Sequence, residues 1–180
     1  MNYEHRYLLE FKKKLDNLDL LSFKKAEKII KTFRKNSKKK IIILGNGGSS
    51  AIASHATVDF LKNNKLNILN FSDHSLLTCY ANDFGYENIF VNILKQYLNK
   101  NDLLIIISSS GESKNIVNAV NYCKQQKVKL IGFSGFARDN LLNSKSDIKF
   151  WVNSTNYNII ENTHQAWLLM LCDKLAKKKI

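Results

Sequence analysis

From residue 40 onward, short continuous runs of apolar residues alternate with longer segments of helical periodicity. Such runs, with no polar residue at every second position, are typical of parallel strands that are covered on both faces. Strands that alternate with helices need right-handed crossovers and form a doubly wound sheet. We therefore predict an α/β fold with a five-stranded parallel sheet flanked by helices. The predicted strands are Ile41–Leu44, Leu66–Phe71, Leu103–Ile107, Val128–Phe133 and Ile148–Val152.

Helical patterns lie between these strands and at both ends of the chain. The predicted helices around the strands are Ser50–Leu61, Glu87–Leu98, Lys114–Gln126, Ala137–Asn143 and Tyr157–Lys178. Before the first strand, apolar residues recur every three or four positions and predict two amphipathic helices, the second capped by Asp19 or Ser22. Because the sequence shows no linker or repeat, we expect one domain, with N-terminal helices in 1–37 and an α/β core in 38–180.

The chain is strongly basic, with 28 Lys and Arg residues against 15 Asp and Glu and a formal net charge of +13. A basic stripe between Lys24 and Lys40 can attract nucleic acid, but lysine is abundant throughout, so we favour solvated lysine faces. No apolar run approaches the roughly 20 residues of a membrane span. The N-terminus does not resemble a secretory signal. We expect a cytoplasmic protein with no membrane partner and with buried, reduced cysteines.

Two loops that follow predicted strands have the composition of a phosphate site. The first runs from Gly45 to Ser50 as GNGGSS, and we assign Asn46, Gly47 and Gly48 to substrate binding. It lacks both the GxGxxG spacing and the P-loop lysine, so we expect no nucleotide cofactor. The second loop, SSSGES, has four hydroxyls where one N-cap would be enough. Both loops open helices at one edge of the sheet, where helix N-termini favour an anion.

These loops resemble those of the SIS (sugar isomerase) domain, and further stretches resemble its sedoheptulose-7-phosphate (phosphoheptose) isomerase family. Those stretches are LGNGGSSAIASHATVDFL, SDHSLLTCYANDFGYENIF and the ending LLMLCDKL. The resemblance implies a homotetramer with active sites at subunit interfaces, and a role in supplying heptose for lipopolysaccharide or capsule. It implies sugar contacts from Asp83, in a predicted loop. It also implies phosphate contacts from Ser49, Ser108, Ser109, Ser110 and Ser113.

Aldose–ketose isomerisation moves a proton between adjacent carbons through an enediol, which requires a base and an acid or metal. His55 and Asp59 are four residues apart and share a helix face. The resemblance implies that this face carries a zinc-binding histidine and a catalytic glutamate, which Asp59 replaces. It also places Glu161 at a zinc-binding glutamine and Leu169 at a zinc-binding, catalytic histidine. His164 matches a different histidine of the family.

Three interpretations remain open. Zinc is bound by His55, Asp59 and Glu161; or a metal-free enzyme uses Glu161 or Asp59 as base and His55 or His164 as acid; or catalysis is lost. We favour a phosphosugar isomerase that converts sedoheptulose 7-phosphate to D-glycero-D-manno-heptose 7-phosphate, or acts on a related sugar phosphate. The alternative is a non-catalytic SIS adaptor that binds a protein partner, of the type that associates with a replication initiator.

Overall fold

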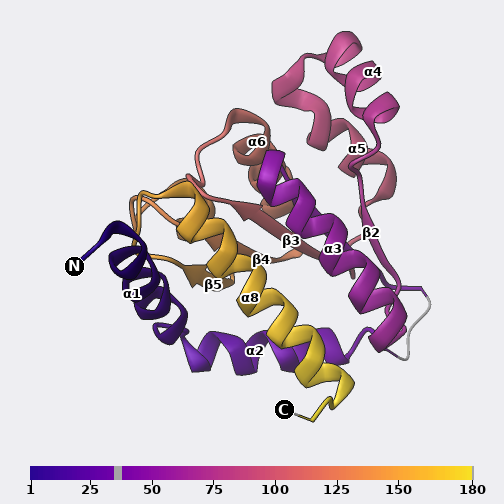
Figure 1. The fold of residues 1–180 in the computed structure, drawn as a ribbon. Coiled ribbons are helices and arrows are strands. Elements are labelled where there is room, and N and C mark those ends of the chain that lie inside the picture. Colours follow the sequence, from indigo (N-terminus) through magenta and orange to yellow (C-terminus); the bar gives the residue numbers. More distant parts are fainter. Residues whose placement is uncertain (35–37, 180) are drawn as a thin grey trace.

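A computed structural model describes residues 1–34 and 38–179. Its five strands form one parallel sheet in the order β2-β1-β3-β4-β5, which confirms the predicted fold (Figure 1). The strands are β1 (Ile41–Gly45), β2 (Ile68–Asn70), β3 (Leu103–Ser108), β4 (Lys129–Ser134) and β5 (Ile148–Trp151). From β1 the chain adds β2 on one side and then crosses to β3 on the other. The strand order therefore reverses at β1, where a doubly wound sheet opens a crevice for ligands.

The helices agree with the predicted pattern, apart from the helix that contains Asp83. They are α1 (Tyr3–Asp16), α2 (Leu20–Lys31), α3 (Gly47–Asn64), α4 (His74–Phe84), the 3₁₀ helix η1 (Tyr86–Asn88), α5 (Ile89–Tyr97), α6 (Lys114–Gln125), α7 (Leu141–Lys145) and α8 (Tyr157–Ala176). The expectation of a loop around Asp83 was wrong, because this residue lies in the last turn of α4. The Asp73 side chain accepts a hydrogen bond from the Leu76 N–H and caps α4. No residue of α4 is fully buried, and its apolar residues Leu76, Leu77, Tyr80 and Ala81 pack against the core only in part.

Alternate residues of the central strands β1, β3 and β4 pack into two separate cores, one on each face of the sheet. Ile41 and Ile43 of β1 belong to the core that α2, α3 and α8 cover. Ile42 and Leu44 point the other way, into the core covered by α5 and α6. Each buried isoleucine or leucine contributes about 1.5–3 kcal/mol through removal from water. Figure 1 shows α3 and α8 side by side on the first face, and α4 set out beyond the body of the sheet.

Two of the three cysteines, Cys123 and Cys172, are buried as expected, but the third is not. Cys79 is exposed because it lies on α4, so the prediction of a buried thiol was wrong there. Among the described residues, no helix combines the length and apolar character required to span a membrane.

Candidate functional site

The site is built on two helix N-termini that lie at the carboxyl ends of neighbouring strands. Helix α3 follows β1 and helix α6 follows β3, and β1 and β3 are paired over their whole length. Asn46 and Ser113 occupy the two N-cap positions. Within the described part of the chain, neither side chain accepts a capping hydrogen bond from its own helix. Both N-termini therefore have first-turn N–H groups available for an anion.

The serine loop between β3 and α6 supplies hydroxyl donors next to these N–H groups. The Ser108 Oγ accepts a hydrogen bond of 3.2 Å from the Gly111 N–H, and the Ser110 Oγ accepts one of 3.3 Å from the Glu112 N–H. A hydroxyl that accepts can still donate its own proton. The Ser109 Oγ is buried and has no hydrogen-bond partner among the described residues. A buried polar atom of this kind normally has a partner, so this loop is suited to a ligand that accepts hydrogen bonds.

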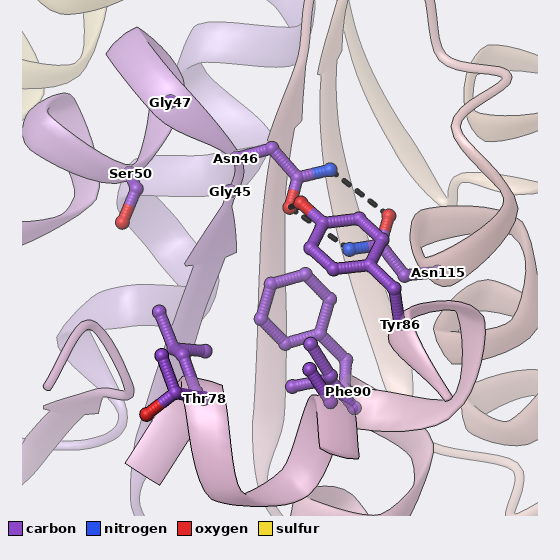
Figure 2. A pocket seen from close by; sticks show the side chains of 11 residues that line it. Gly45, Asn46, Gly47, Ser50, Thr78, Tyr86, Phe90 and Asn115 are labelled. Atoms are coloured by element: carbon purple, nitrogen blue, oxygen red, sulfur yellow. Dashed lines mark hydrogen bonds between the residues drawn. The ribbon is translucent and has the colours of Figure 1, made fainter. Parts of the chain in front are cut away.

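The glycine loop is tied to α6 by a network of side chains (Figure 2). The Asn46 Nδ2 donates to the Asn115 Oδ1, and the Asn115 Nδ2 donates to the Asn46 Oδ1, both at 2.9 Å. The Tyr86 hydroxyl donates to the same Asn46 Oδ1 at 3.2 Å. These three residues line a pocket of about 270 Å³ at the carboxyl end of β1. The predicted Asn46 and Gly47 both belong to its lining, whereas the predicted Ser49 is buried beside it.

Glu161 on α8 lies directly against the glycine loop. A Cβ atom on Gly48 would lie only 2.7 Å from the Glu161 Cδ, so the carboxylate occupies the space that glycine leaves free. Partial burial raises the pKa of the Glu161 carboxyl above its usual range, because desolvation disfavours the charged form. A carboxylate with a raised pKa is a stronger base near neutral pH. Of the predicted acid–base candidates, Glu161 is the one that lies against the glycine loop.

His55 and Asp59 form a pair of their own farther along α3. The His55 Nε2 lies 3.6 Å from the Asp59 Oδ2, and the His55 Nδ1 lies 3.4 Å from the Gln165 Nε2 on α8. Sequence reasoning missed Gln165, although it follows Glu161 by four residues and so shares its helix face. Across the described residues, no three His, Cys, Asp or Glu side chains form a cluster able to hold a metal ion. The predicted zinc ligands His55, Asp59 and Glu161 therefore do not form such a cluster within the described part of one chain.

His164 has a structural position that argues against its predicted role as a catalytic acid. It is completely buried, and its Nε2 lies 3.0 Å from the carbonyl oxygen of Ser134. Its ring also meets the Phe133 ring edge to face. Burial lowers the pKa of His164 to about 4, which keeps the imidazole neutral as a donor to the carbonyl. We therefore correct this candidate to a core residue.

Two further predicted positions lie outside the pocket. The carboxylate of Asp83 is exposed and accepts hydrogen bonds from the Cys79 thiol at 3.5 Å and the Asn82 amide at 3.1 Å. Leu169 is half-buried and packs against the core that α2, α3 and α8 cover. The expected contact between Asp83 and the sugar thus stays a prediction.

The fold and the site define a class of doubly wound α/β proteins with a serine-rich loop and two helix N-termini suited to an anion at the switch point. Comparison with known proteins identifies the class. Residues 6–135 match the family model described as the SIS domain. A phosphoheptose isomerase of Francisella tularensis has the same fold, with a TM-score of 0.86, 26% identity and coverage of 97% of this chain and 95% of that one. The chain is therefore a member of the SIS-domain proteins.

Sequence relatives identify the branch within this class. The phosphoheptose isomerase 2 of Campylobacter jejuni is 35% identical over 155 residues, which span 83% of this chain and 76% of that protein. The phosphoheptose isomerase of Thermodesulfovibrio yellowstonii is 34% identical over 180 residues, spanning 92% and 88%. The chain belongs to the phosphoheptose isomerase family.

Proposed function

We propose that this protein is an aldose–ketose isomerase of sugar phosphates that interconverts sedoheptulose 7-phosphate and D-glycero-D-manno-heptose 7-phosphate. One observation carries the proposal: a carboxylate with a raised pKa, Glu161, lies against a loop that opens an uncapped helix beside a serine-rich cradle. The relatives named above act on phosphoheptose, which supports this substrate class. They are isomerases, and they give no support to the adaptor alternative.

In this proposal the phosphate is bound by the N-termini of α3 and α6 and by Ser108, Ser109, Ser110 and Ser113. The positive ends of the two helices offset the phosphate charge. Glu161 removes the proton from the carbon beside the carbonyl and returns it to the neighbouring carbon of the enediol. The carbon-bound proton stays on Glu161 between these two events. The enediol also passes a hydroxyl proton from the oxygen that becomes the new carbonyl to the oxygen of the former carbonyl, so the atoms balance without another reactant. The raised pKa suits both halves, because the protonated form must also be accessible.

The cytoplasmic location and the homotetramer belong to the same proposal. Support for assembly comes from large apolar side chains that are exposed on neighbouring helices: Val58 and Leu61 on α3, and Met170 on α8. Contiguous exposed apolar surface commonly marks a protein interface. His55 is exposed on the same helix, three residues before Val58, so a neighbouring subunit would bring further groups near the His55–Asp59 pair.

The test is proton exchange followed by NMR with sedoheptulose 7-phosphate in D₂O. We expect deuterium at the carbon beside the carbonyl, and formation of aldose, in chelator-treated protein as well as after zinc addition. Glu161→Gln should lower the exchange rate by about 10²–10⁴-fold, the range for loss of an acid–base group. Glu27→Gln is the matched control, since Glu27 pairs with Lys31 on the remote helix α2.

Two outcomes would count against the proposal. Full turnover by Glu161→Gln would remove Glu161 from the mechanism and leave Asp59 as the remaining carboxylate candidate. Failure of the unmodified protein to exchange any proton, while it still binds the sugar phosphate, would favour a non-catalytic binding protein.

A further inference from the structure

Asn115 connects the two loops of the site, although no sequence pattern assigned it a role. It is 1% exposed and lies in the first turn of α6, while its partner Asn46 lies 69 residues earlier at the start of α3. The two amides form a reciprocal pair with both bonds at 2.9 Å. Asn115 is thus the side chain through which the serine-loop helix contacts the glycine loop.

The orientation of both amides is dictated by the backbone of α6. The Ile116 N–H donates to the Asn115 Oδ1 at 2.9 Å, and an N–H can only donate. This bond fixes which atom of Asn115 is the oxygen, so its Nδ2 must face the Asn46 Oδ1. The Asn46 Nδ2 must then face the Asn115 Oδ1. The amide of Asn46 therefore has one allowed orientation rather than two.

The same constraint extends to Tyr86 on η1. Because Asn46 presents its Oδ1, the Tyr86 hydroxyl has to donate its proton there, at 3.2 Å. The lone pairs of the Tyr86 oxygen are then left as acceptors, and one proton of the Asn46 Nδ2 remains to be donated. Figure 2 shows Tyr86 and Asn46 close together at the pocket. A donor beside an acceptor matches a sugar hydroxyl, which accepts from one and donates to the other.

We propose that Asn115 is a positioning residue of this site, which acts through Asn46 and sets Asn46 and Tyr86 to receive a hydroxyl of the sugar phosphate. The inference rests on the proposed function for the identity of the ligand. It also accounts for an oddity of α3: its N-cap residue does not cap the helix, because its side chain is held by Asn115 instead. The asparagine at this position thus serves the pocket rather than the helix.

The test is a double-mutant cycle on KM and kcat. Asn115→Ala should raise KM about tenfold, the effect of one lost hydrogen bond at a binding site, with a smaller change in kcat. The double variant Asn46→Ala/Asn115→Ala should be no worse than Asn46→Ala alone, because Asn115 acts through Asn46. Asn121→Ala is the control, since Asn121 lies on the same helix and contacts Lys145 away from the pocket. Its KM should stay unchanged.

Asn115→Asp provides a second variant in case alanine at a buried position prevents folding. Its carboxylate would face the Asn46 Oδ1 and repel it, whereas the protonated acid would donate there and restore the pair. Relative to the unmodified enzyme at each pH, its KM should therefore fall as the pH drops from about 7 to about 5. A residue with only a packing role would not produce this rescue.

NMR of the Asn46 side-chain amide distinguishes failure of this inference from failure of the proposed function. Without substrate, Asn115→Ala should bring the two Nδ2 proton shifts together, because the hydrogen-bonded proton loses its partner. If the unmodified protein does not act on sedoheptulose 7-phosphate, the function fails but this signature still reports positioning. Unchanged Asn46 shifts, additive losses in the cycle, or Asn115→Ala with an unchanged KM would each overturn the inference.

Discussion

The helices of this protein begin in two different ways. Five of them start with an Asn or Asp whose side chain accepts an N–H of the first turn: Asn2, Asp19, Asp73, Asn140 and Asn156. Within the described residues, three α-helices start without such a bond. One is α5, which follows η1 directly at Asn88; the other two are the crevice helices α3 and α6, where Asn46 and Ser113 stand at the cap positions. A side-chain cap typically stabilises a helix by about 1 kcal/mol. The N-cap residues of the two crevice helices provide no such stabilisation. In α6 the Ile116 N–H is bound by the Asn115 Oδ1, and the first-turn N–H groups that remain are those that would meet a phosphate.

The largest effect should come from Gly48→Ala, in the first turn of α3, whose N-cap side chain makes no capping hydrogen bond. Alanine favours a helix over glycine by about 0.5–1 kcal/mol, so the free energy of unfolding should not fall. However, the new Cβ would lie 2.7 Å from the Glu161 Cδ and would push the carboxylate away. A displacement of about 1 Å can cost on the order of 10²-fold in turnover. Turnover of sedoheptulose 7-phosphate and denaturant unfolding would be measured on the same preparation.

This result would separate function from stability at one residue. Ala51→Gly is the opposite control, since it lies one turn farther along α3 at an exposed position and should lower stability but not turnover. If Gly48→Ala kept normal turnover, Glu161 would not need its present position for catalysis.

The second effect concerns His164, which is buried in the core. His164 has a pKa of about 4 in the folded protein, against about 6.5 when unfolded. Between these values the unfolded state binds a proton and the folded state does not, so stability falls as the pH drops through this window. The expected loss is about 3 kcal/mol from pH 6.5 to pH 4. Unfolding in denaturant at a series of pH values measures it.

His164→Gln removes the titrating group, and its unfolding free energy should depend less on pH in the same window. The absolute stability of the variant is not the readout, because the substitution also changes packing beside Phe133. An equal pH slope in both proteins would show that another group is responsible.

The third prediction places a negative charge at the N-terminus of α6, whose N-cap side chain makes no capping hydrogen bond. Ser113→Asp places a carboxylate at the N-cap of α6, where aspartate is a favoured residue. We expect the free energy of unfolding to rise by about 0.5 kcal/mol. Phosphate affinity should fall by about tenfold or more, because like charges repel at this range. Ser113→Asn is the neutral match and should weaken phosphate binding less; equal losses would mean that charge is not the cause.

The sequence predicts the fold and the position of the two loops well, because both depend on local composition. Continuous apolar runs determine buried parallel strands, and glycines or serines directly after a strand can only lie at its carboxyl end. The pairing of Asn46 with Asn115 could not be read in this way, since it joins residues 69 positions apart. His164 was misjudged for a related reason: it shares a helix face with Glu161, but that face runs from the cradle into the core.

The smallest effect should come from the start of α2, a helix whose N-cap side chain does make a capping hydrogen bond. The Asp19 Oδ1 accepts from the Leu21 N–H at 2.9 Å, and its Oδ2 accepts from the Ser22 hydroxyl at 2.7 Å. Asp19→Ala should lower the free energy of unfolding by about 1 kcal/mol, whereas Asp19→Asn, still able to cap, should lose only a few tenths. The Ser22 hydrogen bond lowers the pKa of Asp19, so the contribution is present at neutral pH and is lost on acidification. Phosphate affinity, measured by calorimetry, should not change. A loss of affinity like that of Ser113→Asp would show that helices with and without a side-chain cap do not differ in their role in phosphate binding.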